Sequence, residues 1–331
     1  MPKYLVLRFS SIGDILLTTP VVRCLAMQQP GSEIHYLTRT SYASLLEPLP
    51  YIHRVISFEQ HTGEILRTLK QEHYDFVIDL HKNFRSVFLR ARLGRPSASF
   101  PKLNFRKWWL VHTGMNLLPS VHVTDRYFEA VRPLGITNDG KGLDLVIPEA
   151  EEVSEEAYPE AFRNGFVAMA VGARHFTKQI PAGLAAGILR NSTMPFVLLG
   201  GKEDHPKAEE IISQVHQPVW NACGQLSLLQ SASVLRRALA VVTADTGLMH
   251  MAAALGKKTL SIWGSTTPAF GMYPYLPGRE HLSVMTGVET LACRPCSKLG
   301  HSRCPRGHFK CMNEIDAGEV ASLLMKLLSK D

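Results

Sequence analysis

The chain has 331 residues, of which 45% are hydrophobic and 20% are charged. This composition is typical of a soluble globular protein, and the length suggests two domains. No apolar run approaches the ~18 residues needed to span a bilayer, and Lys3 leads into an apolar strand without a signal-peptide cleavage pattern. Six cysteines in a chain of this size do not imply a disulfide framework. We therefore expect a cytoplasmic protein rather than a membrane-spanning or disulfide-rich secreted one.

The formal net charge of +7 is concentrated in one segment. Between Leu80 and Thr124 there are eight Lys and Arg residues and no Asp or Glu. The aromatic residues that interleave with them are Phe84, Phe88, Phe100, Phe105, Trp108 and Trp109. Such a patch could face nucleic acid, an anionic membrane surface or an acidic substrate. The alternative is a solvated basic helix whose aromatic residues pack into the core.

Apolar runs alternate with helical patterns through the first half of the chain. The predicted strands are Tyr4–Phe9, Glu33–Thr38, Arg54–Ser57, Asp75–Leu80 and Leu143–Pro148. Ser10–Asp14 is predicted as a loop after the first strand. The predicted helices run from that loop to about Gln28, around 41–47, around 62–73 and over 122–135. Thr18, Thr19 and Pro20 mark either a kink or a fresh N-terminus in the first of these helices. The acidic stretch Glu149–Glu160 lacks strong periodicity, and we place the domain boundary there, between domains 1–150 and 151–331.

The second half repeats the same alternation. Its predicted strands are Phe166–Val171, Phe196–Leu199, Pro218–Ala222, Leu239–Thr243 and Thr259–Trp263. Its clearest helices are predicted over Leu226–Ala238 and from about Asp316 to Leu328. Strands that alternate with helices predict a parallel sheet with helices on its faces. Two such halves joined by a linker predict an α/β protein with two Rossmann-like domains facing across a cleft.

The stretch from Leu239 to Thr266 carries the clearest candidate site. Asp245, Thr246 and Gly247 turn a buried strand into a helix whose apolar face is predicted at 248, 251, 252 and 255. Loops at the carboxyl edge of a parallel sheet bind ligands, and amides at the start of a helix suit a phosphate. The alternative is the tight turn of any βαβ unit.

Four further side chains stand near predicted strand ends. Asp14 could act as a base, or it could cap the helix that follows. Lys178 could pair with a phosphate, or it could be one more exposed lysine. Glu203, after Gly200 and Gly201, could accept from ribose hydroxyls or be a solvated loop charge. His250, one turn beyond the start of its helix, is either a ligand contact or a structural histidine.

Several absent motifs narrow the reaction class. The chain has no G-x-G-x-x-G after a strand, so the fingerprint of a dinucleotide-binding site is missing. It also has no G-x-x-x-x-G-K-[ST], which argues against a P-loop NTPase. It has no Asp-x-Asp, which argues against the usual metal–diphosphate arrangement. It also lacks HExxH and G-x-S-x-G.

A cysteine-rich loop lies near the C-terminus. Cys293, Cys296, Cys304 and Cys311 are separated by two, seven and six residues, and together with His301 and His308 they could coordinate a structural zinc. This spacing departs from two CxxC knuckles. We favour reduced thiols in an ordered loop.

The motifs reached so far resemble glycosyltransferase family 9, the ADP-heptose–lipopolysaccharide heptosyltransferases. The resemblance covers nearly the whole chain. It rests on VLRFSSIGDILLTTPVVRCL, GARHFTKQIP and ADTGLMHMAAALGKKTLSIWGSTTP. The tail CRPCSKLGHSRCPRGHFKCM is similar to that of the heptosyltransferase II branch.

This resemblance implies a GT-B fold with an acceptor-binding first domain and a nucleotide-sugar donor in the second, and a last helix that can pack back on the first domain. It also implies an inverting transfer of heptose from ADP-heptose to the inner core of lipopolysaccharide, without a divalent metal. One alternative is a family-9 transferase that uses another nucleotide sugar. An alternative of a different class is a basic nucleic-acid-binding protein, but no recognised nucleic-acid motif is present.

The resemblance also assigns roles to residues. Asp14 matches the family's catalytic base in S-S-x-G-D, and Lys178, which follows Thr177, matches its phosphate-binding lysine. The donor loop D-T-G-x-x-H is matched by Asp245, Thr246, Gly247 and His250, whereas Glu203 is a looser match to the ribose-binding acid.

For the basic segment, the resemblance implies an anionic, lipid-linked acceptor. Lys82, Arg85, Arg90 and Arg92 would then meet the Kdo carboxylates and lipid A phosphates of that acceptor. The implied location is the cytoplasmic face of the inner membrane, through peripheral contact, with no nucleic-acid partner.

Overall fold

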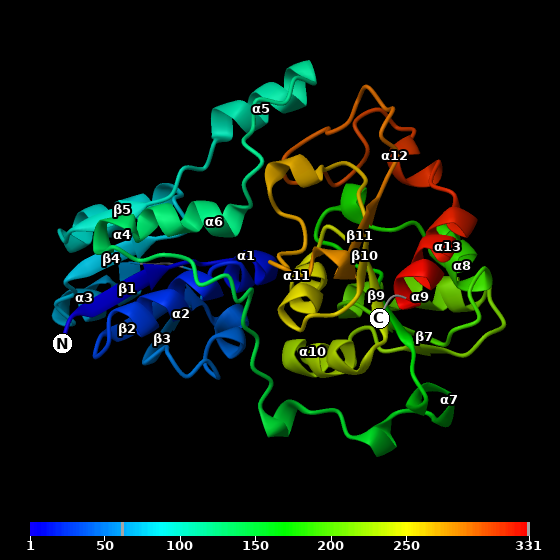
Figure 1. Cartoon of the computed structure of the whole chain (residues 1–331), viewed down its shortest axis with the longest axis horizontal. Helices are drawn as coiled ribbons and strands as arrows, with labels where there is room; N and C mark the ends of the chain where they lie inside the picture. The colour runs from blue at the N-terminus through cyan, green and yellow to red at the C-terminus, as the bar shows by residue number, and fades with distance from the viewer. Residues whose placement is uncertain (61–62, 330–331) are drawn as a thin grey trace. The chain divides into compact units, whose positions relative to one another are not determined.

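The computed structural model describes residues 1–60 and 63–329, and the chain divides into two compact units. The first unit holds Met1–Leu103 and Val121–Val146, and the second holds Asn104–Ser120 and the chain from Ile147 onward. This division differs from continuous domains of 1–150 and 151–331 in two respects, because residues 104–120 and residues 147–150 group with the second unit. Each unit is an α/β structure with its own parallel sheet (Figure 1).

The first unit is built on five parallel strands in the order β3-β2-β1-β4-β5. These strands are β1 (Lys3–Leu7), β2 (Glu33–Arg39), β3 (Arg54–Phe58), β4 (Phe76–Asp79) and β5 (Ser97–Ser99). In β1 every residue after Lys3 is buried, as expected for a strand covered on both faces of a parallel sheet. Leu7 pairs with Leu37 on one side and Asp79 on the other. The loops that follow β1 and β4 therefore start side by side.

Short helices cover both faces of this sheet. They are α1 (Ile12–Leu16), α2 (Thr19–Gln28), η1 (Thr40–Leu45), α3 (Gly63–Gln71), α4 (Phe84–Leu93), α6 (Val123–Tyr127), η2 (Phe128–Ala130) and η3 (Arg132–Leu134). Leu69 of α3 and Leu89 of α4 pack with Leu5 and Val77 in one core cluster. Right-handed crossovers place α2 on the other face (Figure 1). Residue 62, where the third predicted helix begins, lies outside the described residues.

Two predicted elements before the linker are wrong. Residues 143–148 form no strand: the N–H of Asp144 donates to the Thr19 hydroxyl at 2.9 Å, and its carboxylate lies 2.5 Å from the Arg23 guanidinium. Side-chain contacts therefore fix this segment, instead of backbone hydrogen bonds to a neighbouring strand. The single helix expected over 122–135 is instead the three short turns α6, η2 and η3. Pro133, which has no N–H to donate, stands in the last of them.

The second unit has six parallel strands in the order β11-β10-β9-β6-β7-β8. They are β6 (Val167–Ala170), β7 (Phe196–Leu199), β8 (Val219–Asn221), β9 (Ala240–Ala244), β10 (Thr259–Ile262) and β11 (Ser283–Thr286). Because β6, β9 and β10 are neighbours, the loops after them open at one stretch of the carboxyl edge.

The helices of this unit are α5 (Asn104–Thr113), α7 (Glu160–Arg163), α8 (Ala182–Arg190), α9 (His205–Ile212), α10 (Leu228–Arg237), α11 (Gly247–Ala254), α12 (Lys310–Asn313) and α13 (Ala317–Leu328). The 3-10 turns are η4 (Glu149–Glu151), η5 (Glu155–Ala157), η6 (Phe176–Lys178), η7 (Lys202–Asp204), η8 (Pro268–Phe270) and η9 (Glu280–Leu282).

The main core of the second unit lies between one face of its sheet and three helices. Leu189 of α8, Ile211 of α9 and Leu324 of α13 share a single cluster with the strands, so the last helix packs on the core of its own unit. Helices α10 and α11 lie on the opposite face (Figure 1). In the part of the chain that the structure describes, no helix is both long and apolar enough to cross a membrane.

Candidate functional site

In the first unit, Asp14 lies in the loop and helix that follow β1. Its Oδ2 accepts hydrogen bonds from the N–H of Ser11 at 3.3 Å and from the Ser11 hydroxyl at 3.0 Å. Ser11 is the residue before α1, so Asp14 makes the helix-start contact of a capping box. Its other oxygen, Oδ1, lies 2.5 Å from Nη2 of Arg8. Asp14 is thus both a capping residue and one partner of an ion pair.

Arg8 holds Asp14 from inside the unit. Its Nη1 donates to the Leu80 carbonyl at 2.5 Å and to the Tyr127 hydroxyl at 3.1 Å. Burial lowers the pKa of this guanidinium, but the charge and hydrogen bond of Asp14, together with Tyr127 and Tyr36, raise the pKa overall. Arg8 was not evident as a site residue from the sequence, because it stands inside the apolar run predicted as a strand. A single arginine in that run, close before Asp14, was the available signal.

His81 is a second residue that the sequence analysis missed. It follows β4, and its ring lies 4.7 Å from the Phe9 ring, centroid to centroid. Burial, with the cations Arg8 and Lys102 nearby, lowers the pKa of His81 to about 3. The carboxylate of Asp79 accepts the N–H of His81 at 3.0 Å and so fixes the loop. His81 is therefore a neutral side chain at pH 7.

The four basic residues expected at the acceptor divide into two pairs. The Lys82 ammonium donates to a backbone carbonyl at 2.8 Å, and a guanidinium nitrogen of Arg90 lies 3.9 Å from the buried Asp79 carboxylate. Arg85 and Arg92 are exposed, and the Arg92 guanidinium lies over an aromatic ring of its own helix at 4.8 Å. Arg85 and Arg92 are thus the pair available to a ligand on the surface of α4.

In the second unit, the loops after three neighbouring strands converge at Asp245. Its Oδ2 lies 2.7 Å from the Lys178 ammonium and accepts the Thr266 hydroxyl at 2.8 Å. Lys178 follows β6, Asp245 follows β9 and Thr266 follows β10. The structure therefore brings together two residues that the sequence analysis singled out, and adds Thr266 to them.

The loop after β9 leads directly into α11. Thr246 is extended and occupies the N-cap position, and α11 begins at Gly247. The Thr246 hydroxyl lies 3.1 Å from that of Thr243. Because α11 follows β9 closely, its first amides stand at the carboxyl edge of the sheet, where they suit an anion. His250, by contrast, is 2% exposed. It lies within the packed interior of the unit.

Thr177 is bonded within the protein. Its hydroxyl oxygen accepts the N–H of His301 at 2.8 Å and the Ser265 hydroxyl at 3.0 Å. The side chain is buried. Instead of presenting a hydroxyl to a ligand, Thr177 ties the loop that carries Lys178 to the C-terminal loop.

Of the two carboxylates after β7, the structure buries the second. Glu203 is exposed, whereas Asp204 is 7% exposed and accepts the Gly201 N–H at 2.9 Å. Burial raises the pKa of Asp204. A Cβ at Gly172 would overlap the Asp204 carboxylate, so the glycine after β6 allows this close approach. Asp204, which the sequence analysis did not select, thus lies beside the loop that leads to Lys178.

All six cysteines are free thiols in the structure. Sγ of Cys293 lies 3.8 Å from Nε2 of His308, while Cys304 and Cys311 pack at the core of the second unit. Burial, together with the neighbouring thiols, raises the pKa of Cys311 to about 11. The cysteine-rich loop is therefore an ordered part of this unit.

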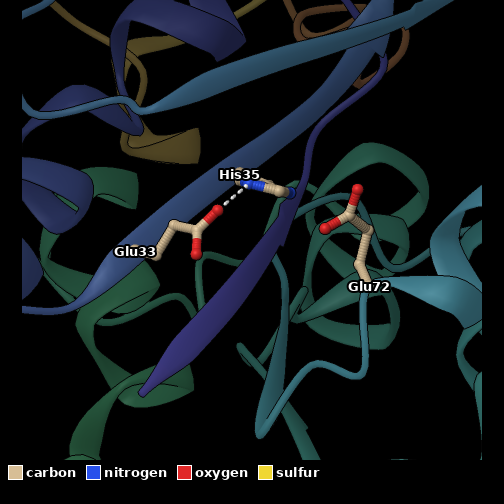
Figure 2. A group of neighbouring side chains, drawn as sticks. All are labelled: Glu33, His35 and Glu72. Carbon is tan, nitrogen blue, oxygen red and sulfur yellow. Dashed lines mark hydrogen bonds and ion pairs between the residues drawn. The ribbon is translucent and has the colours of Figure 1, made fainter. Parts of the chain in front are cut away.

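Within residues 1–60 and 63–329, one group of three ligating side chains has its donor atoms within 4.8 Å of one another: Glu33, His35 and Glu72. Figure 2 shows Glu33 bonded to His35, with Glu72 beside them. The Lys3 ammonium lies 3.2 Å from Glu33 and 2.8 Å from Glu72, and Arg54 lies 2.7 Å from Glu72. These cations already neutralise the carboxylates, so a metal ion would have to displace them. The group lies at the amino end of β1 and β2, away from Asp14.

A family model described as glycosyltransferase family 9 (heptosyltransferase) matches residues 62–300. Lipopolysaccharide heptosyltransferase 2 of Salmonella typhimurium is 24% identical over 99% of each chain. Lipopolysaccharide heptosyltransferase 1 of Pseudomonas aeruginosa is 26% identical over 89% of this chain and 86% of its own. The solved structure of E. coli ADP-heptose lps heptosyltransferase II superimposes with a TM-score of 0.72, at 21% identity and 98% coverage of each chain. Its two α/β units, each with a parallel sheet, have the GT-B fold. The chain belongs to glycosyltransferase family 9, the heptosyltransferases, and is a glycosyltransferase.

Proposed function

We propose that this enzyme transfers heptose from ADP-heptose to the inner core of lipopolysaccharide, with inversion at the anomeric carbon and without a divalent metal. The observation that carries the proposal is the group formed by Lys178, Asp245 and Thr266 beside the first turn of α11. An ammonium group and a helix start at one sheet edge suit a diphosphate. The relatives named lipopolysaccharide heptosyltransferases support the choice of sugar and acceptor.

In this proposal the second unit binds the donor. The Lys178 ammonium and the amides of Thr246 and Gly247 bind the diphosphate, and Asp245 positions Lys178 through their 2.7 Å contact. Glu203, exposed in the loop after β7, is the candidate to accept from the ribose hydroxyls, while the buried Asp204 accepts the Gly201 N–H and shapes that loop.

Two other residues that the sequence assigned to the donor act indirectly. The hydroxyl of Thr177 is bonded to His301 and Ser265, and His250 is buried in α11. Both are therefore assigned as positioning residues. Thr177 supports the Lys178 loop, and His250 supports the first turn of its helix.

The first unit binds the acceptor. Asp14 takes the proton of the acceptor hydroxyl, and the buried guanidinium of Arg8 holds the carboxylate in place. Arg85 and Arg92, exposed on α4, meet anionic groups of the acceptor. The family resemblance suggests that these groups are Kdo carboxylates and lipid A phosphates, reached through peripheral contact at the cytoplasmic face of the inner membrane.

The reaction is then a single displacement. The acceptor oxygen forms a bond to the anomeric carbon from the face opposite ADP, the bond from that carbon to the diphosphate oxygen breaks, and the proton passes to Asp14. Negative charge develops on the departing ADP. Lys178 and the amides of α11 stabilise that charge, which is the task that a metal ion performs in other transferases.

Mass spectrometry of the reaction product tests this proposal. The full-length protein is incubated with ADP-heptose and a panel of truncated core acceptors, and in parallel with other ADP- and UDP-sugars. The expected product is an acceptor heavier by one heptose. Transfer from another nucleotide sugar, with none from ADP-heptose, would instead support the alternative family-9 activity.

A further inference from the structure

Helix α5 presents the side chains of Phe105, Trp108 and His112 to solvent, with the half-buried Trp109 beside them. Phe105, Trp108, Trp109 and His112 follow one another at the i, i+3, i+4 and i+7 spacing of a single helix face. Phe105 is 68% exposed and Trp108 is 51% exposed, whereas Leu110, on the opposite face, is 6% exposed. A surface helix of a globular protein ordinarily turns its apolar face inward. In α5 the aromatic face is the outer one.

We call these four rings the α5 aromatic face; three of them are exposed, and the half-buried Trp109 packs beside them. The ring centroids of Phe105 and Trp108 are 6.2 Å apart, those of Phe105 and Trp109 are 6.0 Å apart, and those of Trp108 and His112 are 4.4 Å apart. Met115, in the loop that follows, is also exposed. Contiguous exposed apolar surface of this kind marks an interaction site more often than isolated exposed residues do.

Contacts on the other side keep α5 in this orientation. The Lys107 ammonium lies 5.8 Å from the centroid of the Phe270 ring, and the Lys298 ammonium lies 3.5 Å from Oδ1 of Asn104. Both contacts join α5 to the rest of the second unit. The helix is thus attached along one side, while the Phe105 and Trp108 rings project from the other.

The charge around the α5 aromatic face favours a lipid surface as its occupant. Residues 104–120 include Arg106 and Lys107 and contain no Asp or Glu, and Arg106 is exposed. Tryptophan at the interface, with flanking Lys or Arg, is the composition of helices that lie in the headgroup region of a membrane. The cations meet lipid phosphates, and the rings enter the boundary of the acyl chains.

We propose that the α5 aromatic face inserts into the surface of an anionic lipid bilayer, with Arg106 against the lipid phosphates. This inference deepens the proposed function, because it names the surface that makes the peripheral membrane contact. It rests on the exposure, spacing and charge of α5 alone. Its test requires no transfer reaction, so it can fail while the transferase proposal stands, and the reverse also holds.

Flotation of the full-length protein with vesicles tests the inference. The vesicles are phosphatidylcholine alone or phosphatidylcholine mixed with phosphatidylglycerol. The protein is expected to float with the mixed vesicles and to dissociate from them as salt rises. The double variant Phe105→Ser/Trp108→Ser should bind vesicles ~tenfold more weakly or worse. It lacks the two aromatic side chains that, in this proposal, become partly buried in the bilayer.

The matched control is Met325→Ser, which removes an exposed apolar side chain from α13 in the same unit. It should float as the unaltered protein does. Circular dichroism and melting temperature should be the same for all three proteins, because the altered side chains are exposed. Absence of flotation by the unaltered protein, or equal flotation by the double variant and the control, overturns the inference.

A second measurement locates the helix in the bilayer. Lipids brominated on their acyl chains should quench tryptophan fluorescence in the bound protein. Trp108→Phe should keep most of the binding while losing part of the quenching. If the double variant abolishes a concentration-dependent dimer, and the unaltered protein ignores vesicles, then the face binds a second copy of the chain and the inference is wrong.

Discussion

The Asp14 carboxylate lies 2.5 Å from the guanidinium of Arg8, which is itself buried in the first unit. The residue proposed as the base is therefore one half of an ion pair, and its charge has a structural task as well as a chemical one. Neutral substitution at this position leaves a buried guanidinium without its carboxylate. Stability and turnover must be measured together in any variant of Asp14.

Asp14→Asn tests the base. A positioned general base accelerates a reaction by ~10²–10⁴-fold, and turnover should fall by about that factor while ADP affinity stays unchanged. The free energy of unfolding should also fall by ~1–3 kcal/mol, because Arg8 loses its charged partner. Ser11→Ala, which removes one hydrogen bond to Asp14 without changing any charge, is the control and should retain most of the turnover. Undiminished turnover of Asp14→Asn in single-turnover kinetics would place the base elsewhere.

Lys178→Ala tests the donor site. Loss of the ammonium should weaken ADP binding by ~1.5–3 kcal/mol, the range of a charge-assisted hydrogen bond, as measured by titration calorimetry. Lys202→Ala is the matched control, because Lys202 is an exposed lysine after the neighbouring strand β7. If the two variants bind ADP with the same affinity as the unaltered protein, the donor-site assignment is wrong.

Chelation tests metal independence. Activity is expected to persist in EDTA, because Lys178 and the amides of α11 carry the phosphate charge in the proposed mechanism. Circular dichroism should accompany the assay to detect any unfolding of the cysteine-rich loop. Loss of turnover with unchanged circular dichroism, restored by magnesium or manganese, contradicts the prediction.

The exposed arginines of α4 test acceptor binding. Arg85→Ser/Arg92→Ser should raise the Michaelis constant for the acceptor severalfold without changing ADP affinity, because neither side chain forms an ion pair within the described residues. Arg132→Ser removes another exposed arginine of the same unit and should leave both constants unchanged. A change in ADP affinity with a normal acceptor constant would point to a different assignment of the two units.

His81 gives a prediction for pH. Its pKa is about 3 in the folded chain, against an ordinary value of 6.5, so the unfolded chain binds this proton more tightly. The stabilisation is complete above pH 6.5 and is lost as the pH falls toward 3. Between pH 7 and pH 5 the loss should be ~2 kcal/mol from this residue. His81→Asn should lose less stability over that interval in urea titrations; an equal loss would contradict the prediction.

Strands with strong local signals could be predicted from the sequence. The strand Phe196–Leu199 is confirmed residue for residue, since an apolar run stands there between a proline and a glycine. Pro20 marks a fresh helix, because α1 ends at Leu16 and α2 begins at Thr19. The short polar edge strand Ser97–Ser99 has no such pattern. Only its pairing with β4 makes it a strand.

The candidate site was predictable from the sequence only where its residues follow strands with strong local signals. Lys178 and Asp245 each follow a recognisable strand, and parallel strands end at one edge. The pairing of Arg8 with Asp14 depends on how the loop folds back, which local sequence does not encode. Likewise, the sequence did not decide whether the aromatic residues of the basic segment pack inward. Phe100 is buried, whereas Phe105 and Trp108 are exposed.

The contact between Lys178 and Asp245 has a consequence for ligand selection. A bare ammonium at an open sheet edge would attract polyanions of every kind in the cell. With Asp245 at 2.7 Å, the pair is electrically neutral overall, and its long-range field is weak. An anion must therefore approach closely and replace or share the carboxylate contact before Lys178 contributes to binding. Inorganic phosphate gains little from such an exchange, whereas a nucleoside diphosphate can compensate through its other contacts.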